Sequence, residues 1–292
     1  MQTQRTSILI PWDFEKPAHT ALEQSLNIAR LLKLKIFLLY VHEQTGIFSK
    51  FFPADQSEDI LKHISADLTE IATRFSNESG VKIEALIERG KPHDIILAKA
   101  KELNARFIFM GTTNSDENIV GVTTHKVVRS ASCPVITAKG TTHYHDGCRN
   151  ILLPLDLSDE TRQKVGWAIE IAKAYHAKIR AISIINSGMD SEARQHLNIQ
   201  MKQVKNFIDN AKISCQTEFI ETENSKDEAI PRMMNYLYQH PEIDLVIIMT
   251  QKEIGIVDYF LDSEAQQIIR SAKIPVMSVV PRELGQSSMR AF

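Results

Sequence analysis

The sequence has few cysteines: 3 among 292 residues, at Cys133, Cys148 and Cys215. Their number is odd and their spacing is not that of a metal site, so we expect neither a disulfide framework nor a zinc cluster. Disulfides are rare in the reducing cytoplasm, where isolated cysteines stay as thiols. The cysteine content therefore predicts a cytoplasmic protein with reduced thiols.

Long apolar runs and an excess of one charge are absent as well. The longest apolar runs, such as Leu245 to Met249, are much shorter than the about 20 residues of a membrane-spanning helix. Residues 1–7 are polar and lead directly into a predicted strand, so we expect no signal peptide. The 34 basic and 36 acidic residues give a net charge of −2, whereas a nucleic-acid-binding face needs clustered Lys and Arg. These features argue against membrane and nucleic-acid partners.

The sequence does contain an internal repeat. Ile8 to Phe14 (ILIPWDF) recurs as Ile151 to Leu157 (ILLPLDL), and Val127 to Val135 (VVRSASCPV) recurs as Ile268 to Val276 (IIRSAKIPV). A period this long indicates two duplicated domains, because the repeats of solenoids are shorter. We predict a first domain at 1–140, a linker at 141–149 and a second domain at 150–292. Each domain is long enough to bury its own core.

Each half alternates apolar strands with amphipathic helices. In the first half we predict strands at 7–11, 36–41, 82–88, 106–110 and 135–138, with helices at 17–32, 60–76, 95–103 and 124–131. The second half repeats this order, with strands near residues 150, 179, 216, 244 and 276. Continuous apolar strands that alternate with helices are typical of a parallel sheet covered on both faces. The predicted fold class is therefore α/β, with two tandem copies of a five-stranded, doubly wound, parallel-sheet domain.

Ligands of doubly wound sheets bind beyond the carboxyl ends of the strands. In the first half the residues at these ends and at the start of the following helix are Pro11, Asp13, Val41, His42, Gly111, Thr112, Gly121, Val122, Thr123 and Thr124. A helix N-terminus presents free N–H groups to an anion, and a carboxylate such as Asp13 can accept a hydrogen bond from an adenine or ribose edge. As a set, these residues predict a small-molecule pocket.

Taken one at a time, the same residues have ordinary structural interpretations. Asp13 can be a turn or cap residue, and either threonine at 123–124 can be a helix N-cap. Gly111 can simply permit close passage of another part of the chain. Both interpretations stay open at this point.

Three segments resemble motifs of the universal stress protein family: the opening ILIPWD at 8–13, the middle FMGT at 109–112 and the closing VVRSASCPV at 127–135. The resemblance covers nearly the whole chain, twice. It implies a five-stranded parallel sheet of the adenine nucleotide alpha hydrolase-like type and a non-catalytic role in stress response. ATP-binding members of the family carry Gly-x2-Gly-x9-Gly-Ser/Thr after the fourth strand.

The first half departs from that motif. Gly111 and Gly121 match its first and last glycines, but Asn114 replaces the second glycine and Val122 replaces the hydroxyl residue. The loop is also three residues shorter than the motif. The threonines at 123–124 are candidates to replace part of the missing hydroxyl function. ATP or AMP binding in the first half is therefore expected to be weak or absent.

Acidic residues argue further against a triphosphate. Asp116 and Glu117 lie in the first-half loop, where they would repel it. In the second half we align Thr250 with the first glycine, and Asp262 stands where Gly121 stands in the first half. A carboxylate at that helix start would interact with the N-terminus in place of a phosphate. We therefore expect no nucleotide in the second half.

Signatures of catalysis and metal binding are lacking. The sequence contains no Gly-x-Ser-x-Gly elbow, Walker loop or His-Glu-x2-His motif, and 13–16 (DFEK) lacks the glycines of an ATP pyrophosphatase loop. His143, His145 and Cys148 provide one ligand fewer than structural zinc needs, so no metal site is expected. Two functions remain: a non-catalytic stress-response or ligand-sensing regulator, and an ATP-binding protein with slow hydrolysis in the first half.

The last strand of each half, at 135–138 and 276–280, has unpaired backbone groups if it lies at a sheet edge. Pairing the two strands across a two-fold axis would satisfy those groups within one chain. We predict such an intramolecular pseudo-dimer, against the alternative of two separate domains on a flexible linker. A further homodimer of whole chains is left open.

Overall fold

The structure is a computed structural model that describes residues 5–43, 54–112, 121–139, 147–156, 161–223, 225–250 and 262–281. The elements of the first half are β1 (Ser7–Pro11), α1 (Lys16–Leu32), β2 (Lys35–His42), α2 (Ala54–Ser79), β3 (Ile83–Arg89), α3 (Pro92–Glu102), β4 (Ala105–Thr112), α4 (Val122–Ser130) and β5 (Val135–Lys139). Those of the second half are β6 (Asn150–Pro154), α5 (Thr161–Tyr175), β7 (Lys178–Asn186), α6 (Ser191–Asn210), β8 (Cys215–Thr222), α7 (Ser225–Gln239), β9 (Leu245–Met249), α8 (Asp262–Ser271) and β10 (Val276–Val279). The predicted alternation of strands and helices is confirmed.

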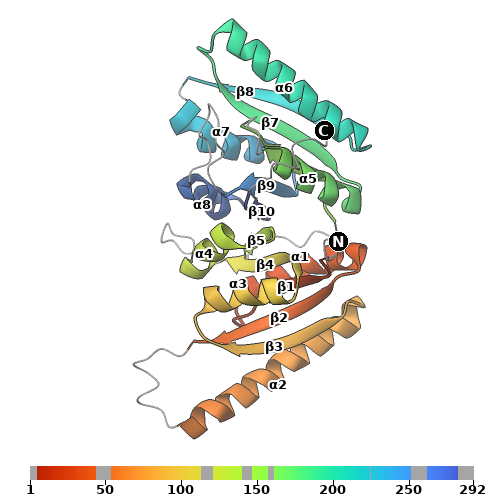
Figure 1. The fold of residues 1–292 in the computed structure, drawn as a ribbon, viewed down its shortest axis with the longest axis vertical. Coiled ribbons are helices and arrows are strands. Elements are labelled where there is room, and N and C mark those ends of the chain that lie inside the picture. Colours follow the sequence, from red (N-terminus) through yellow and green to blue (C-terminus); the bar gives the residue numbers. More distant parts are fainter. Residues whose placement is uncertain are drawn as a thin grey trace.

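The ten strands of the described residues form one sheet in the order β3-β2-β1-β4-β5-β10-β9-β6-β7-β8. Within each half the paired strands are parallel, as the apolar runs predicted. The order of the second half mirrors that of the first, so the two halves are related by an approximate two-fold axis between β5 and β10 (Figure 1). The fold class predicted from the sequence is confirmed.

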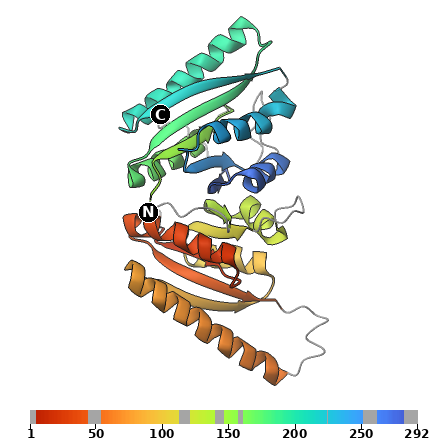
Figure 2. The same ribbon diagram turned by 180° about the vertical axis from the view of Figure 1, so that it is seen from behind.

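The helices form a layer on each face of the sheet. Helices α1, α2, α5 and α6 cover one face, and α3, α4, α7 and α8 cover the other (Figures 1 and 2). Each layer has its own cluster of buried apolar residues that runs through both halves. Since successive side chains of a strand point to opposite faces, strands such as β1 (SILIP) contribute to both clusters, and are apolar almost throughout.

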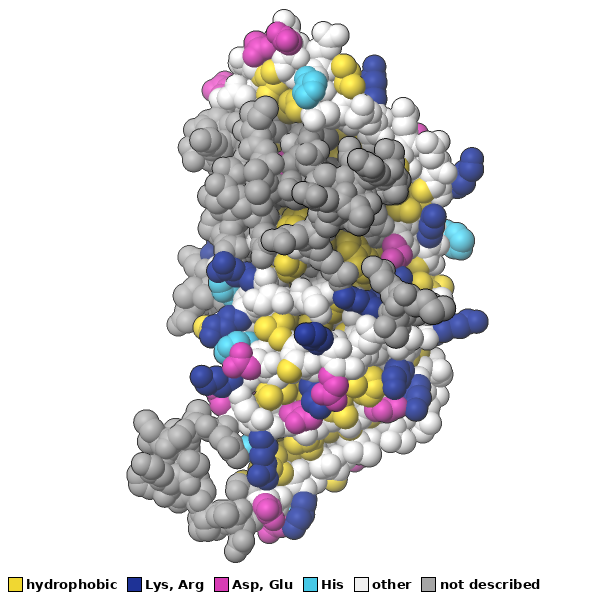
Figure 3. All heavy atoms as spheres, viewed as in Figure 1, with side chains coloured by type: hydrophobic (Ala, Val, Ile, Leu, Met, Phe, Trp, Pro, Cys, Tyr) yellow, Lys and Arg dark blue, Asp and Glu magenta, His cyan; other side chains and the backbone are white. Residues whose placement is uncertain are grey.

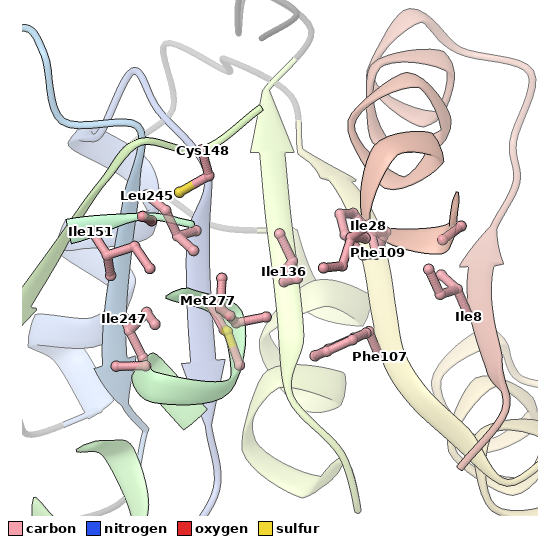
Figure 4. Packing of buried hydrophobic residues seen from close by; sticks show 14 of the residues in the cluster. Ile8, Ile28, Phe107, Phe109, Ile136, Cys148, Ile151, Leu245, Ile247 and Met277 are labelled. Atoms are coloured by element: carbon pink, nitrogen blue, oxygen red, sulfur yellow. The ribbon is translucent and has the colours of Figure 1, made fainter. Parts of the chain in front are cut away.

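The two halves meet where β5 pairs antiparallel with β10, with Met277 opposite Ile136. Figure 4 shows the side chains of both residues within a continuous row of apolar residues that crosses from one half to the other. The ring centroids of Phe107 and Trp167 lie 5.9 Å apart across this seam. The predicted pairing of the two final strands is confirmed, and the halves pack against each other instead of standing apart.

An ion pair reinforces the seam. The Arg106 guanidinium on β4 lies 2.6 Å from the Glu170 carboxylate on α5 through Nη2, and its Nε donates to the same oxygen at 3.1 Å. Nearby, the side-chain hydroxyl of Thr137 on β5 donates a hydrogen bond to the backbone carbonyl of Val276 on β10 at 3.3 Å. The seam therefore combines strand pairing, aromatic packing and a charge pair.

Two helix starts test the capping predictions. Helix α3 begins at Pro92, three residues before the predicted start at 95, because the fixed φ of proline suits the first turn of a helix. Helix α4 begins at Val122, two residues before the predicted start at 124, with Gly121 as its N-cap, so neither threonine at 123–124 caps this helix. The reason is that the chain already turns helical at Val122, and Thr124 is buried within the first turn.

All three cysteines are buried, and none of them forms a disulfide in the structure. Burial raises the pKa of the Cys148 thiol well above its usual range, and the nearby Asp244 carboxylate raises it further. Of the proposed linker cluster only Cys148 is described; His143 and His145 lie outside the described residues. The described part of the chain contains no group of three or more His, Cys, Asp or Glu that could hold a metal ion. None of its helices is long and apolar enough to cross a membrane.

Candidate functional site

The carboxyl end of β1 leads into a tight turn. Asp13 is exposed, and its Oδ1 accepts a hydrogen bond from the backbone N–H of Glu15 at 3.0 Å. Phe14 has a φ of 66°, a left-handed conformation that is uncommon outside glycine. The buried Trp12 ring packs edge-on against His19, with 4.5 Å between their centroids. One oxygen of Asp13 therefore stabilises the turn before α1, while the side chain still faces solvent.

The neighbouring strand ends are half-buried. Pro11 pairs with Leu39 in β2, and the backbone N–H of Trp12 donates to the Leu39 carbonyl at 2.8 Å. Val41 and His42, at the end of β2, are also partly exposed. Since β1 lies between β2 and β4 and is parallel to both, these three strand ends meet at one edge of the sheet.

Gly111, near the end of β4, lies directly beneath the first turn of α1. A Cβ atom at this position would come within 2.3 Å of the Pro17 carbonyl carbon and 2.6 Å of the Ala18 nitrogen. The next residue, Thr112, is buried, and its hydroxyl donates to the Ala138 carbonyl at 3.4 Å. Close packing of α1 therefore requires the glycine, whatever ligand is bound, and the Thr112 hydroxyl is directed to β5.

The start of α4 is the most accessible part of this edge. Gly121 is exposed and has open space around it, and Val122 is 67% exposed. Thr123 is half-buried and Thr124 is buried. No acidic residue lies in the first turn of α4. Residues 113–120, including Asn114, Asp116 and Glu117, lie outside the described residues.

The described charges of α4 are basic. Lys126 and Arg129 are exposed, and the Lys126 ammonium lies 3.5 Å from Nε2 of His93 at the start of α3. Figure 3 shows that Lys, Arg, Asp and Glu are otherwise intermixed over the described part of this face of the first half. The first turn of α4 therefore has no negative charge of its own to oppose an anion at its N–H groups.

The sheet register corrects one of our alignments. In the first half Gly111 lies beside Ala138, and in the second half the residue beside Val279 is Met249. Because Ala138 and Val279 are equivalent in the repeat, Met249 occupies the position of Gly111, and the assignment of Thr250 to that position is wrong. Thr250 instead occupies the position of Thr112, the threonine that follows Gly111.

Thr250 has a different role at the seam. It is buried, and its hydroxyl donates to the carbonyl of Val128 in α4 at 3.3 Å. Asp262 begins α8, and nothing is described of its side chain. The second half therefore contacts the α4 helix of the first half through Thr250.

The sequence reasoning missed two buried charges in the second half. Asp156, two residues after β6, is 8% exposed, and Lys164, in the first part of α5, is 0% exposed. The repeat offset places Lys164 at the position of Ala21. Comparing the two halves residue by residue along their helices would have revealed this change from a methyl group to an ammonium.

A doubly wound sheet, parallel within each half, with polar groups at the carboxyl ends of its strands defines an α/β protein of the kind in which ligands, where they are bound, lie beyond those ends. The profile of the universal stress protein family matches residues 4–139 and again 147–280. The chain therefore belongs to the universal stress protein family, as a member with two such domains.

Individual proteins agree with this membership. A universal stress protein of Methanocaldococcus jannaschii is 27% identical over 139 residues, which are 45% of this chain and 81% of that protein. A putative universal stress protein of Staphylococcus aureus is 30% identical over 138 residues, which are 46% of this chain and 83% of that protein. The crystal structure of a universal stress protein from Archaeoglobus fulgidus has the same fold over 95% of this chain and 99% of its own, with a TM-score of 0.73 and 18% identity.

Proposed function

We propose that this protein is a non-catalytic, ligand-sensing stress protein whose first half takes a nucleotide-type ligand at the carboxyl ends of β1, β2 and β4. The observation that carries the proposal is the start of α4. Gly121 is exposed, the first turn has no acidic residue, and Lys126 adds a positive charge. Backbone N–H groups at such a helix start are suited to a phosphate.

The phosphate-bearing end of the ligand would lie at Gly121, and its base or ribose would lie toward Asp13 and Val41. Asp13 has one oxygen in the turn with Glu15 and a second oxygen available to a ligand donor. The acidic pair Asp116 and Glu117 in the connecting loop argues for a monophosphate such as AMP over ATP.

The residues around this edge also favour binding without turnover. Asp13 is exposed and held in a turn, and among the described residues the His42 side chain contacts no nucleophile. Efficient hydrolysis needs an activated nucleophile or an oriented general base. Slow ATP hydrolysis in the first half is the rival function, and its signature is a turnover rate that falls on Asp13→Ala.

A thermal-shift titration tests the proposal. Wild-type protein is titrated with AMP and with ATP, each with and without Mg²⁺, because a ligand that binds only the folded state raises Tm with concentration. We expect AMP to raise Tm more than ATP, and Gly121→Asp to abolish the shift by placing a carboxylate at the helix start. Gln203→Asp, which adds the same charge on the exposed face of α6, is the matched control and should respond as wild type does.

An unchanged response of Gly121→Asp would move the site away from α4. The absence of any nucleotide response in wild type would reject the nucleotide class itself. ATP turnover that depends on Asp13 would favour the hydrolytic rival.

A further inference from the structure

A cluster of charged and hydrogen-bonding side chains lies at the outer edge of the second half. Helix α7 packs on β7 and on β8, the last strand of the sheet (Figure 1). Between these elements lie Arg180 of β7, Glu218 of β8, Tyr236 of α7, and His240 and Glu242 of the turn that follows α7. Each of the five contacts another member of the cluster. None of them belongs to the candidate site of the first half.

The first half builds the same fold without this cluster. Arg180 corresponds at the repeat offset to Phe37, which is 3% exposed and belongs to the apolar cluster of its layer. Glu218 corresponds by strand register to Leu86, which packs against the same apolar cluster. The charged residues are therefore not needed to form the strands and helices at this edge, and their presence calls for another explanation.

One nitrogen of His240 has two neighbours that it cannot bind at the same time. Its Nδ1 lies 2.7 Å from Nη1 of Arg180 and 3.1 Å from Oε1 of Glu242. A guanidinium is only a donor, so Nδ1 must lack a proton to accept from Arg180. An ionised carboxylate is only an acceptor, so a bond to Glu242 needs a proton on the same nitrogen. Which of the two bonds forms therefore depends on the protonation of the ring.

The Arg180 guanidinium has other partners if it leaves Nδ1. Its Nη2 lies 3.1 Å from Oε1 of Glu242. Its Nη1 donates to the Tyr236 hydroxyl at 3.5 Å, and that hydroxyl donates to Glu218 at 2.9 Å. A small movement of the guanidinium toward Tyr236 and Glu218 is therefore open to it.

The carboxylates of the turn after α7 have fixed roles. A hydrogen bond from its own backbone N–H lowers the pKa of the Glu242 carboxyl, and the His240 hydrogen bond and the Arg180 charge lower it further. Glu242 therefore stays ionised under mildly acidic conditions. Asp244, the other carboxylate of this turn, accepts the backbone N–H groups of Arg149 and Asn150 at 2.7 and 2.9 Å. Among the side chains of this turn, the imidazole is thus the group that changes charge.

We propose that Arg180, His240 and Glu242 form a pH-sensitive contact that ties the end of α7 to β7. The neutral imidazole accepts from Arg180, and the guanidinium bridges His240 and Glu242. When the ring takes a proton from solvent, as histidine does between about pH 8 and pH 5, Nδ1 donates to Glu242 instead. The ring is then a second cation close to the guanidinium, which moves toward Tyr236 and loosens the outer edge of the sheet. This contact is independent of any nucleotide in the first half.

A double-mutant cycle at two pH values tests the proposal. Arg180→Met removes the guanidinium and keeps the aliphatic stem, and His240→Phe keeps a ring beside Tyr236, whose centroid lies 4.3 Å from that of His240. The wild type, both single variants and the double variant are unfolded in urea at about pH 8 and about pH 5, on either side of the range in which histidine titrates. We expect favourable coupling at the higher pH, worth about a two- to fivefold change in the unfolding equilibrium. At the lower pH the coupling should vanish or become unfavourable.

The cycle of Arg180→Met with Glu242→Ala is the matched control. Its coupling should remain favourable at both pH values, because Arg180 and Glu242 keep their charges. Favourable coupling of Arg180 with His240 that is equal at both pH values would overturn the proposal. Absence of that coupling at the higher pH would overturn it as well.

Nitrogen NMR of the isotope-labelled wild type gives a second test that needs no variant to fold. It reports directly which ring nitrogen carries a proton. At about pH 8 we expect the His240 proton on Nε2, with Nδ1 as the acceptor. On acidification Nδ1 should gain a proton, and the guanidinium signals of Arg180 should shift with the same midpoint. A proton on Nδ1 at the higher pH, or Arg180 signals that do not follow His240, would overturn the inference.

Discussion

Replacing Gly111 by alanine separates the structural role of this glycine from a role in ligand binding. The added Cβ would lie 2.3 Å from the Pro17 carbonyl carbon and 2.5 Å from its oxygen, whereas ordinary contact begins at 3.4 Å. The first turn of α1 would have to retreat by about 1 Å from a close-packed sheet. Both groups in the clash are backbone, so no rotamer change relieves it.

Overpacking of this kind costs about 1–3 kcal/mol, and we expect Gly111→Ala to lose stability at the upper end of that range. Urea unfolding followed by circular dichroism measures the loss as a lower midpoint at unchanged slope. Gly147→Ala, where the added Cβ meets nothing within 4 Å, is the matched control and should unfold almost as wild type does. A midpoint of Gly111→Ala equal to that of the control would refute the close approach of α1 to β4.

Three further predictions concern the second half and the seam. Gly166 is exposed within α5 and has open space for a Cβ atom. Gly166→Ala should therefore raise the free energy of unfolding by about 0.5–1 kcal/mol in the same urea experiment. A lower free energy of unfolding would contradict the open space at this position. The half-buried ion pair of Arg106 and Glu170 joins the two halves. A double-mutant cycle to alanine should therefore give a coupling free energy of about 1 kcal/mol between the two residues. Zero coupling would mean that the pair does not form in solution. Burial raises the pKa of the Cys215 thiol from 9.0 to about 11. The thiol of the unfolded chain therefore loses its proton at a lower pH than the thiol of the folded chain. As a result, the free energy of unfolding falls by about 2–3 kcal/mol as the pH rises from 9.0 toward 11. Cys215→Ala should show a smaller loss over the same window, and an identical pH profile would be evidence against thiol burial.

The arrangement of strands and helices was predictable because it depends on short-range patterns. Apolar runs such as 36–41 are long enough for a strand buried on both faces, and the repeat of ILIPWDF made the duplication evident. The pairing of β5 with β10 followed from the general cost of an unpaired edge strand. None of these inferences needed side-chain geometry.

The details of the candidate edge were less predictable, because they depend on how closely two elements approach. The sequence shows Gly111 in a motif-like position, but only the structure shows the backbone of Pro17 against it. The motif placed Thr250 opposite that glycine, whereas the strand register assigns the position to Met249. Lys164 reads as an ordinary solvated helix residue, and its complete burial follows from the position of α5 on the sheet.

A crystal structure of the full-length protein grown with AMP tests the central claim most directly. We predict one AMP per chain, with its phosphate at the N–H groups that follow Gly121 and its base or ribose beside Asp13. In the second half, no nucleotide should be bound at the start of α8. A nucleotide bound in the second half, or a phosphate held away from α4 in the first, would contradict the account.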